Sequence, residues 1–253
     1  MKKIISILTI IVVLISCEKK ETPLVFDTKT YNPENLDACD KGMCPVIKIE
    51  KLTASGNDNF SDTINKAIEQ VLVNTLTISP DDSQNIKTLD QALANFITSY
   101  RAYRNDFPEA AIEYEINSKS QISYESENVL SIIFDNYSYW GGAHGYGSTT
   151  YINFDKETHE QLSKEALFSD KGGFLKFTEG QFRNQKGISE GENINSSGYF
   201  FENDTFSLPE NIGFKDDKII LIYNPYEIAS YADGQIILEF PITEVQKYLR
   251  PNL

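Results

Sequence analysis

The chain contains few of the residues that enzymes most often use for catalysis or metal binding. Its 253 residues include two histidines, His144 and His159, and three cysteines. A Ser-His-Asp hydrolase needs a histidine oriented beside an activated serine, and the sequence has no Gly-x-Ser-x-Gly turn. A zinc site needs three or four converging ligands, and neither histidine has a cysteine near it in the sequence. We therefore predict that the protein is not an enzyme, has no catalytic residues and binds no metal or cofactor.

The sequence also lacks an apolar run long enough to cross a membrane. Its longest apolar stretch, Ile4–Ile15, has about a dozen residues, whereas a membrane-spanning helix needs about 20. A short apolar stretch that follows Lys2 and Lys3 is typical of a signal peptide. The stretch ends in LISC (14–17), which resembles a bacterial lipobox, the signal in which the cysteine is lipidated and becomes the first residue of the mature chain.

We predict a lipoprotein signal peptide over residues 1–16 and lipidation of Cys17. An ordinary secretory signal and a buried strand are the alternatives. The acyl chains of a lipoprotein anchor hold a protein on a bilayer, because each buried methylene contributes about 0.8 kcal/mol. We therefore expect a cell-envelope protein that is anchored in a membrane by lipid. The outer membrane is favoured, and the periplasmic face and the cell surface both stay open.

Positive charge is scarce. The chain has 23 Lys and Arg against 37 Asp and Glu, a net charge of −14. Removal of residues 1–16 takes away Lys2 and Lys3 and no acid, so that the mature chain has a net charge of −16. A surface of this sign repels nucleic acid and anionic lipid, and we exclude nucleic acid as a partner. It favours either solubility alone or a cationic protein partner.

The two remaining cysteines, Cys39 and Cys44, stand close together with Gly42 between them. In an exported protein such a pair predicts a disulfide. A metal site is the alternative, but no other cysteine or histidine lies nearby in the sequence. We expect the disulfide ring to end a tether, residues 17–43, and to lead into the first folded strand.

Hydrophobic periodicity predicts two helices followed by strands. Apolar residues recur at helical spacing over 57–76 and 88–107. After these segments the period changes to two, as at Ile112 and Tyr114, which predicts a meander of antiparallel strands. The C-terminal part indicates a helical region, two strands around a loop and a terminal helix. We predict an α+β fold, an antiparallel sheet with helices packed on one face, in two tightly joined halves.

A glycine-rich stretch, SYWGGAHGYGS (138–148), contains the single tryptophan. Its glycines supply positive φ angles or close approach where a strand reverses. Tyr139 and Trp140 face opposite sides of the strand, so one of them is expected to pack beneath the helices. The stretch is either the rim of a hairpin or part of a binding surface with the loop NPYEIASYADG (224–234). The candidate ligand-binding residues are Tyr139, Trp140, His144, Tyr146, Pro225, Tyr226 and Tyr231.

Two stretches resemble a known pair of domains: DNYSYWGGAHGYGSTTYINFD (135–155) and LIYNPYEIASYADGQIILEFPITEVQKYL (221–249). The chain resembles, from about residue 45 to its end, the paired uncharacterised envelope domains of RsiV and PdaC. RsiV is a lysozyme-sensing anti-sigma factor, and PdaC is a peptidoglycan deacetylase in which the domains precede the catalytic domain. The run PYEIxxYxxG (225–234) is the most specific motif.

The resemblance implies a PdaC-like N-terminal half over residues 44–147, with two helices and a strand meander, and an RsiV-like C-terminal half over 148–253. It also implies envelope domains with no catalytic apparatus of their own. The chain departs from both proteins, since we find neither a sigma-binding segment nor a deacetylase domain in it.

We therefore predict a lipid-anchored, non-catalytic binding module for a lysozyme-like protein or a peptidoglycan-type ligand. A second interpretation is a cell-wall glycan-modifying enzyme in which His144 and Glu227 are acid/base partners, which requires the two side chains to meet in a cleft. A third is a structural envelope lipoprotein without a small ligand. The sequence gives no indication of the oligomeric state.

Overall fold

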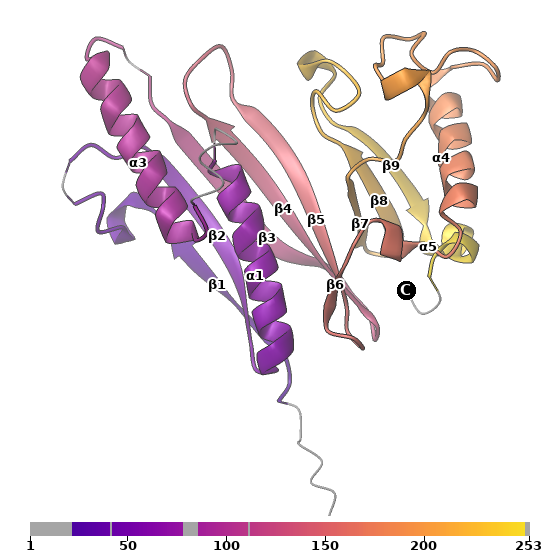
Figure 1. Cartoon of the computed structure of the whole chain (residues 1–253), viewed down its shortest axis with the longest axis horizontal. Coiled ribbons are helices and arrows are strands. Elements are labelled where there is room, and N and C mark those ends of the chain that lie inside the picture. The colour runs from indigo at the N-terminus through magenta and orange to yellow at the C-terminus, as the bar shows by residue number, and fades with distance from the viewer. Residues whose placement is uncertain (1–21, 41, 78–85, 111, 251–253) are drawn as a thin grey trace, which may run out of the picture.

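The computed structural model describes residues 22–40, 42–77, 86–110 and 112–250 (Figure 1). The predicted signal peptide and the lipidation site Cys17 lie outside these ranges. None of the helices in the described ranges has the length and apolar character needed to span a membrane.

The N-terminal part of the described chain forms a six-stranded sheet in the order β1-β2-β3-β4-β5-β6. Neighbouring strands are antiparallel except β2 and β3, which are parallel because the chain passes from one to the other through two helices. The strands are β1 (Val25–Tyr31), β2 (Val46–Ser55), β3 (Glu115–Glu125), β4 (Val129–Tyr139), β5 (Tyr146–Asp155) and β6 (Glu160–Leu162).

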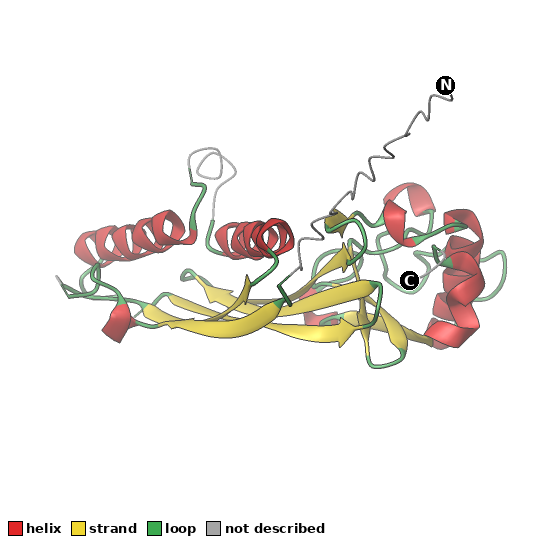
Figure 2. Cartoon of the chain, turned by 90° about the horizontal axis from the view of Figure 1, so that it is seen from below, coloured by secondary structure: helices red, strands yellow, loops and turns green. Residues whose placement is uncertain are grey.

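Two long helices, α1 (Asp58–Thr75) and α3 (Leu89–Asp106), form where the sequence predicts them. Both lie on the same face of the sheet (Figure 2). Their apolar stripes face the strands and form one core with them, for example through Ile64, Ile68 and Phe96. The predicted α+β fold with helices on one face of the sheet is confirmed.

The C-terminal part forms a second, smaller layer. Its three strands, β7 (Asn211–Lys215), β8 (Lys218–Tyr223) and β9 (Ile236–Pro241), are antiparallel neighbours. Helix α4 (Lys171–Lys186) and the short α5 (Ile242–Val245) pack on them, and Phe174, Phe182, Phe214 and Tyr223 are fully buried there. Short 3-10 helices occupy Pro33–Asn35, Glu165–Leu167, Glu202–Asp204, Tyr231–Asp233 and Gln246–Tyr248.

The second layer packs against the face of the first sheet that the helices leave open. Ile133 and Tyr151 from the first sheet form a separate buried cluster with Ile220 and Ile222. Two hydrogen bonds cross the same contact: Asn153 Nδ2 donates to the Ile212 carbonyl at 2.8 Å, and the Phe214 N–H donates to Ser131 Oγ at 3.1 Å. The two halves are thus joined through a shared apolar and hydrogen-bonded contact.

Two segments lie differently from the sequence-based expectation. Residues 25–31, within the predicted tether, form β1 and pair along β2. This strand gives little hydrophobic signal, because only Tyr31 of its seven residues is buried. The boundary predicted between residues 147 and 148 falls inside β5, which pairs with β4 over residues 146–155 and belongs to the first sheet.

The expected disulfide is present between Cys39 and Cys44, whose Cα atoms are 5.3 Å apart. Arg101 of α3 holds the same loop: its Nε donates to the Met43 carbonyl at 2.8 Å and its Nη2 to the Ala38 carbonyl at 2.6 Å. The ring is therefore fixed to the helical layer as well as closed on itself.

A buried carboxylate at the end of β5 ties the C-terminal segment to the first sheet. Asp155 accepts hydrogen bonds from the N–H groups of Glu157 and Thr158 and forms an ion pair of 2.8 Å with Arg250. Burial opposes its ionisation, but these partners together hold the pKa of Asp155 below its ordinary value of 3.8.

We expect Asp155→Asn to lower the free energy of unfolding by about 1–2 kcal/mol at pH 7. Because the folded-state pKa is depressed, the stabilisation is fully present above the ordinary pKa and is lost as the pH falls through the folded value. Urea unfolding of both proteins between pH 2 and pH 7 measures the difference. Asp216→Asn, on the exposed β7–β8 turn, is the control and should change little. A difference independent of pH would contradict the assignment.

Candidate ligand-binding groove

A groove of about 540 Å³ opens on the first sheet, on the face opposite the helices. Its floor is a grid of side chains on β3, β4 and β5 that point to the same side, since alternate residues of a strand share a face. The strand register arranges the grid in two rows. One row is Asn117, Tyr137 and Gly147, and the other is Lys119, Asp135 and Thr149.

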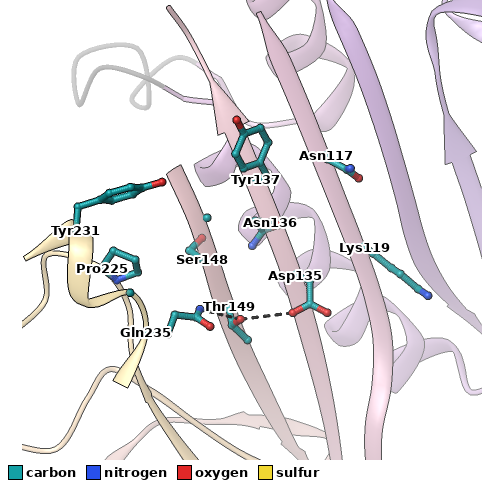
Figure 3. Close-up of a pocket in the computed structure, with 12 residues that line it drawn as sticks. Asn117, Lys119, Asp135, Asn136, Tyr137, Ser148, Thr149, Pro225, Tyr231 and Gln235 are labelled. Carbon is teal, nitrogen blue, oxygen red and sulfur yellow. Dashed lines mark hydrogen bonds between the residues drawn. The ribbon is translucent and has the colours of Figure 1, made fainter. Parts of the chain in front are cut away.

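The loop between β8 and β9 forms one wall of the groove, and Pro225, Tyr231 and Gln235 on it face the side chains of β4 and β5 (Figure 3). Asn224 attaches this loop to the edge of β5: its Oδ1 accepts from the Thr149 N–H and its Nδ2 donates to the Thr149 carbonyl, both at 2.9 Å. The side-chain amide thereby pairs with the backbone as a neighbouring strand would.

Gln235 reinforces the attachment. Its Nε2 donates to Thr149 Oγ1 at 3.0 Å and to Asn224 Oδ1 at 2.9 Å. The groove is therefore built from both halves of the chain, with the floor supplied by the first sheet and the wall by the second layer.

An aromatic cluster, consisting of His144, Tyr146, Tyr226 and Tyr231, lies beside the groove where the two glycine-containing loops meet. The rings of His144 and Tyr231 stack with centroids 3.9 Å apart, and Tyr226 lies 5.6 Å from Tyr231. Tyr231 donates its hydroxyl to the Gly145 carbonyl at 2.8 Å, and Tyr146 donates to the Pro225 carbonyl at 3.4 Å. The contacts bring loop residues 144–146 and 225–231 together.

Three glycines of the 138–148 stretch have a structural role that a side chain would disturb. Gly141 and Gly142 have φ angles of 84° and 109°, a conformation that L side chains rarely adopt. At Gly145 an added Cβ would lie within 2.6 Å of Cε2 of Tyr137. Gly145 thus makes room for the ring of Tyr137, which stands at the floor of the groove.

The structure brings together five of the seven predicted ligand-binding residues: His144, Tyr146, Pro225, Tyr226 and Tyr231. Tyr139 stands on the groove side of β4, two residues after Tyr137, and donates its hydroxyl to the Gly142 carbonyl at 3.0 Å.

Trp140 lies apart from this group. Its ring packs edge-on against Phe96 of α3, with centroids 4.5 Å apart, and lies 5.7 Å from Tyr114. Of the neighbouring pair Tyr139 and Trp140, the tryptophan is therefore the residue that packs beneath the helices. It is partly buried against the helix-facing core and does not line the groove, although the sequence placed it among the ligand-binding candidates.

Burial and nearby acids raise the pKa of two tyrosines, one in the groove floor and one in the aromatic cluster beside it. Desolvation, followed by the negative charge of Glu115, raises the pKa of Tyr137. Desolvation, followed by the charge of Glu227, raises the pKa of Tyr146. At neutral pH both hydroxyls therefore keep their protons and can donate hydrogen bonds.

His144 and Glu227 each form hydrogen bonds with other residues and not with each other. His144 Nδ1 is 2.9 Å from the Gly145 carbonyl, and its Nε2 is 3.4 Å from the Tyr226 hydroxyl. Glu227 accepts from the N–H groups of Asn224 and Glu210 at 2.9 and 3.1 Å, and burial raises its pKa. Glu227 therefore shapes the loop that forms the wall, and the acid/base pair required by the enzyme interpretation is not assembled.

Sequence reasoning missed the floor of the groove, including Asn117, Lys119, Asp135 and Tyr137. These residues alternate with buried ones along β3 and β4, a pattern that equally predicts a solvent-exposed face. Among the described residues, no group of three or more His, Cys, Asp or Glu side chains is placed to hold a metal ion.

Two family models match different parts of the chain. Residues 39–146 match a family described as "Deacetylase PdaC", and residues 155–243 match one described as "Protein of unknown function (DUF3298)". The two matches follow one another along the chain. The segment that matches the PdaC model contains the two long helices and strands β3 and β4 of the groove floor, and the segment that matches DUF3298 contains the loop that forms the wall. The groove residues of β5, 147–149, lie between the two matches.

Solved structures of DUF3298 family members have the same fold. A protein from Bacteroides fragilis superposes with a TM-score of 0.65 at 20% identity, covering 92% of this chain and 96% of that one. A protein from Pseudomonas aeruginosa superposes with a TM-score of 0.58 at 17% identity, covering 91% and 95%. The likeness extends over both halves, so the tandem arrangement is a shared architecture.

A curated relative is the peptidoglycan-N-acetylmuramic acid deacetylase PdaC of Bacillus subtilis, which is 24% identical over 120 residues. The match covers 46% of this chain and 25% of the length of that enzyme. The similarity therefore concerns a part of that enzyme's length only.

Proposed function

We propose that the chain is a non-catalytic binding module of the cell envelope whose groove binds a peptidoglycan-type fragment. Placement in the envelope is supported by the match to a domain of a peptidoglycan deacetylase, by the Cys39–Cys44 disulfide and by the lipobox-like sequence that ends at Cys17. A lipid anchor at Cys17 is part of the proposal and would hold the groove close to the cell wall.

The composition of the groove carries the proposal. Tyr137, with 37% of its surface exposed, and Tyr231 offer aromatic surfaces, and Asn117 and Ser148 offer an amide and a hydroxyl beside them. A sugar presents apolar C–H faces to rings and hydroxyl or acetamido groups to polar side chains. The volume of about 540 Å³ falls within the range of roughly 300–1,000 Å³ usual for small-ligand sites.

A second candidate is a cationic protein such as a lysozyme, favoured by the outer side of the aromatic cluster. Tyr226 has 55% of its surface exposed and Tyr146 has 38%, and tyrosines contribute disproportionately to protein interfaces. The net charge of −14 for the whole chain attracts a cationic partner electrostatically.

Substitution of two exposed tyrosines distinguishes a glycan ligand from a protein partner. We expect Tyr137→Ala, in the groove floor, to weaken binding of a soluble disaccharide-peptide muropeptide about tenfold, because the stacking surface is lost. Tyr226→Ala, outside the groove lining, should leave that affinity nearly unchanged. Isothermal titration calorimetry on the mature protein measures both, and circular dichroism verifies the fold.

The same two variants titrated with hen lysozyme test the second candidate. Loss of lysozyme binding in Tyr226→Ala alone would place a protein partner on the aromatic cluster. Absence of muropeptide binding by folded wild-type protein at millimolar concentration would refute the glycan proposal.

A further inference from the structure

The floor of the groove contains an opposite-charge pair whose members do not contact each other. Lys119 on β3 and Asp135 on β4 occupy directly opposite positions, where Cα atoms are about 4.5–5.5 Å apart. Among the ion pairs of the described ranges none includes either residue. Both side chains are exposed and line the groove, and Figure 3 shows them on neighbouring strands.

The partners of the two side chains leave most of their binding capacity unused. Asp135 Oδ1 accepts one long hydrogen bond, 3.4 Å, from Thr149 Oγ1, and a carboxylate has room for several more donors. The Lys119 ammonium has no hydrogen-bond partner in the described structure. Glu50 stands opposite Lys119 on the other side, on β2, but its carboxylate lies 3.9 Å from Lys48.

We propose that Lys119 and Asp135 bind a free α-amino acid group, with its carboxylate on Lys119 and its ammonium on Asp135. This inference rests on the proposed function and names the part of the peptidoglycan fragment that the groove selects. A stem peptide carries such a group wherever a diamino dicarboxylic acid ends in an uncrosslinked side chain. The ammonium and the carboxylate of this group are attached to the same carbon. A lysine and an aspartate on neighbouring strands can therefore contact both at once, the lysine at the carboxylate and the aspartate at the ammonium.

The two rows of the groove floor provide separate positions for the sugar and for the amino acid group of the ligand. Tyr137 and Asn117 form the row next to Asp135 and Lys119, which places the two rows about 7 Å apart along the strands. A sugar on Tyr137 and an amino acid group on the Lys119–Asp135 row therefore do not compete for the same atoms. Gln235, whose Nε2 is bonded to Thr149 and Asn224, closes the wall beside the charged row.

Two muropeptides that differ by one carboxylate test the inference. Each is a disaccharide-tripeptide, with meso-diaminopimelate as the third residue in one and L-lysine in the other. Wild-type protein should bind the diaminopimelate form about tenfold more tightly, because only this form carries a carboxylate on the same carbon as its side-chain ammonium, where it can accept from Lys119 while the ammonium donates to Asp135. Lys119→Gln should bind both forms equally, and Asp135→Asn should weaken both, since both carry the ammonium.

A matched control exists on the same sheet face. Lys48→Gln removes a positive charge one strand away, opposite Asn117 and outside the groove lining, and should keep the tenfold preference. Equal affinity of wild type for the two muropeptides, or an unchanged preference in Lys119→Gln, would overturn this inference while the proposed function stands. Failure of both muropeptides to bind would instead refute the proposed function.

Discussion

Replacement of Gly213 by alanine is expected to lower the free energy of unfolding by about 3 kcal/mol. Gly213 lies in the middle of β7, and an added Cβ would lie 2.7 Å from the Cβ of Tyr151 and closer still to its ring. The ring has no free space into which to move, because Tyr151 is buried with Ile133, Ile220 and Ile222. The strand itself is held by β8 and by the Phe214–Ser131 hydrogen bond.

Urea unfolding followed by tryptophan fluorescence and circular dichroism measures this effect. Gly180→Ala is the matched control, because Gly180 lies within α4 and an added Cβ meets no atom within 4 Å. That change should stabilise the protein by about 0.5–1 kcal/mol. Equal, small effects of the two substitutions would contradict close packing of β7 on the first sheet.

Trp140→Ala should cost about 3 kcal/mol of unfolding free energy. The partly buried indole packs against Phe96 and Tyr114 beneath the helices, so its removal uncovers part of the first core. Ligand affinity of the folded fraction should be close to that of wild type, because Trp140 does not line the groove.

Differential scanning calorimetry and muropeptide titration on the same sample separate the two roles of Trp140. Tyr226→Ala serves as comparison: it removes an aromatic ring that is 55% exposed and should change stability by about 0.5 kcal/mol or less. If Trp140→Ala keeps full stability and loses binding, the tryptophan belongs to the ligand site after all.

The main elements of the fold could be predicted because they follow from local periodicity. The stripe containing Ile64 and Ile68 fixes the buried side of α1, and the stripe containing Leu93 and Phe96 fixes that of α3. Strand β1 escaped prediction because it is an edge strand that buries little. β7 escaped for a different reason: its five residues centre on Gly213, and a strand this short with a central glycine has weak propensity.

The sequence contains a pattern that predicts burial of the sheet face opposite the helices, a burial that we did not predict. Residues 129–134 of β4 read VLSIIF, and all six are buried. A continuous apolar run is typical of a strand covered on both faces. Exposed and buried residues alternate only after this run, from Asp135 to Tyr137, where the groove opens.

The candidate site could be predicted in its loops and not in its floor. The glycine and tyrosine content of 138–148 and 224–234 pointed to the two loops, and the structure joins them through His144 and Tyr231. Lys119 and Asp135 resemble ordinary solvent-facing residues in the sequence. They become groove residues because the β8–β9 loop is attached to Thr149 through Asn224, a pair 75 positions apart.

The sequence alone determined the α+β class, the two helices, the Cys39–Cys44 pair and the acidic charge, because each depends on spacing or composition within a short window. Only the tertiary structure decided that Trp140 packs against the core, that Gly213 is a packing contact and that the floor of the groove comes from the first sheet and its wall from the β8–β9 loop. These features depend on contacts between residues distant in sequence. Local pattern contains no information about which surfaces will meet.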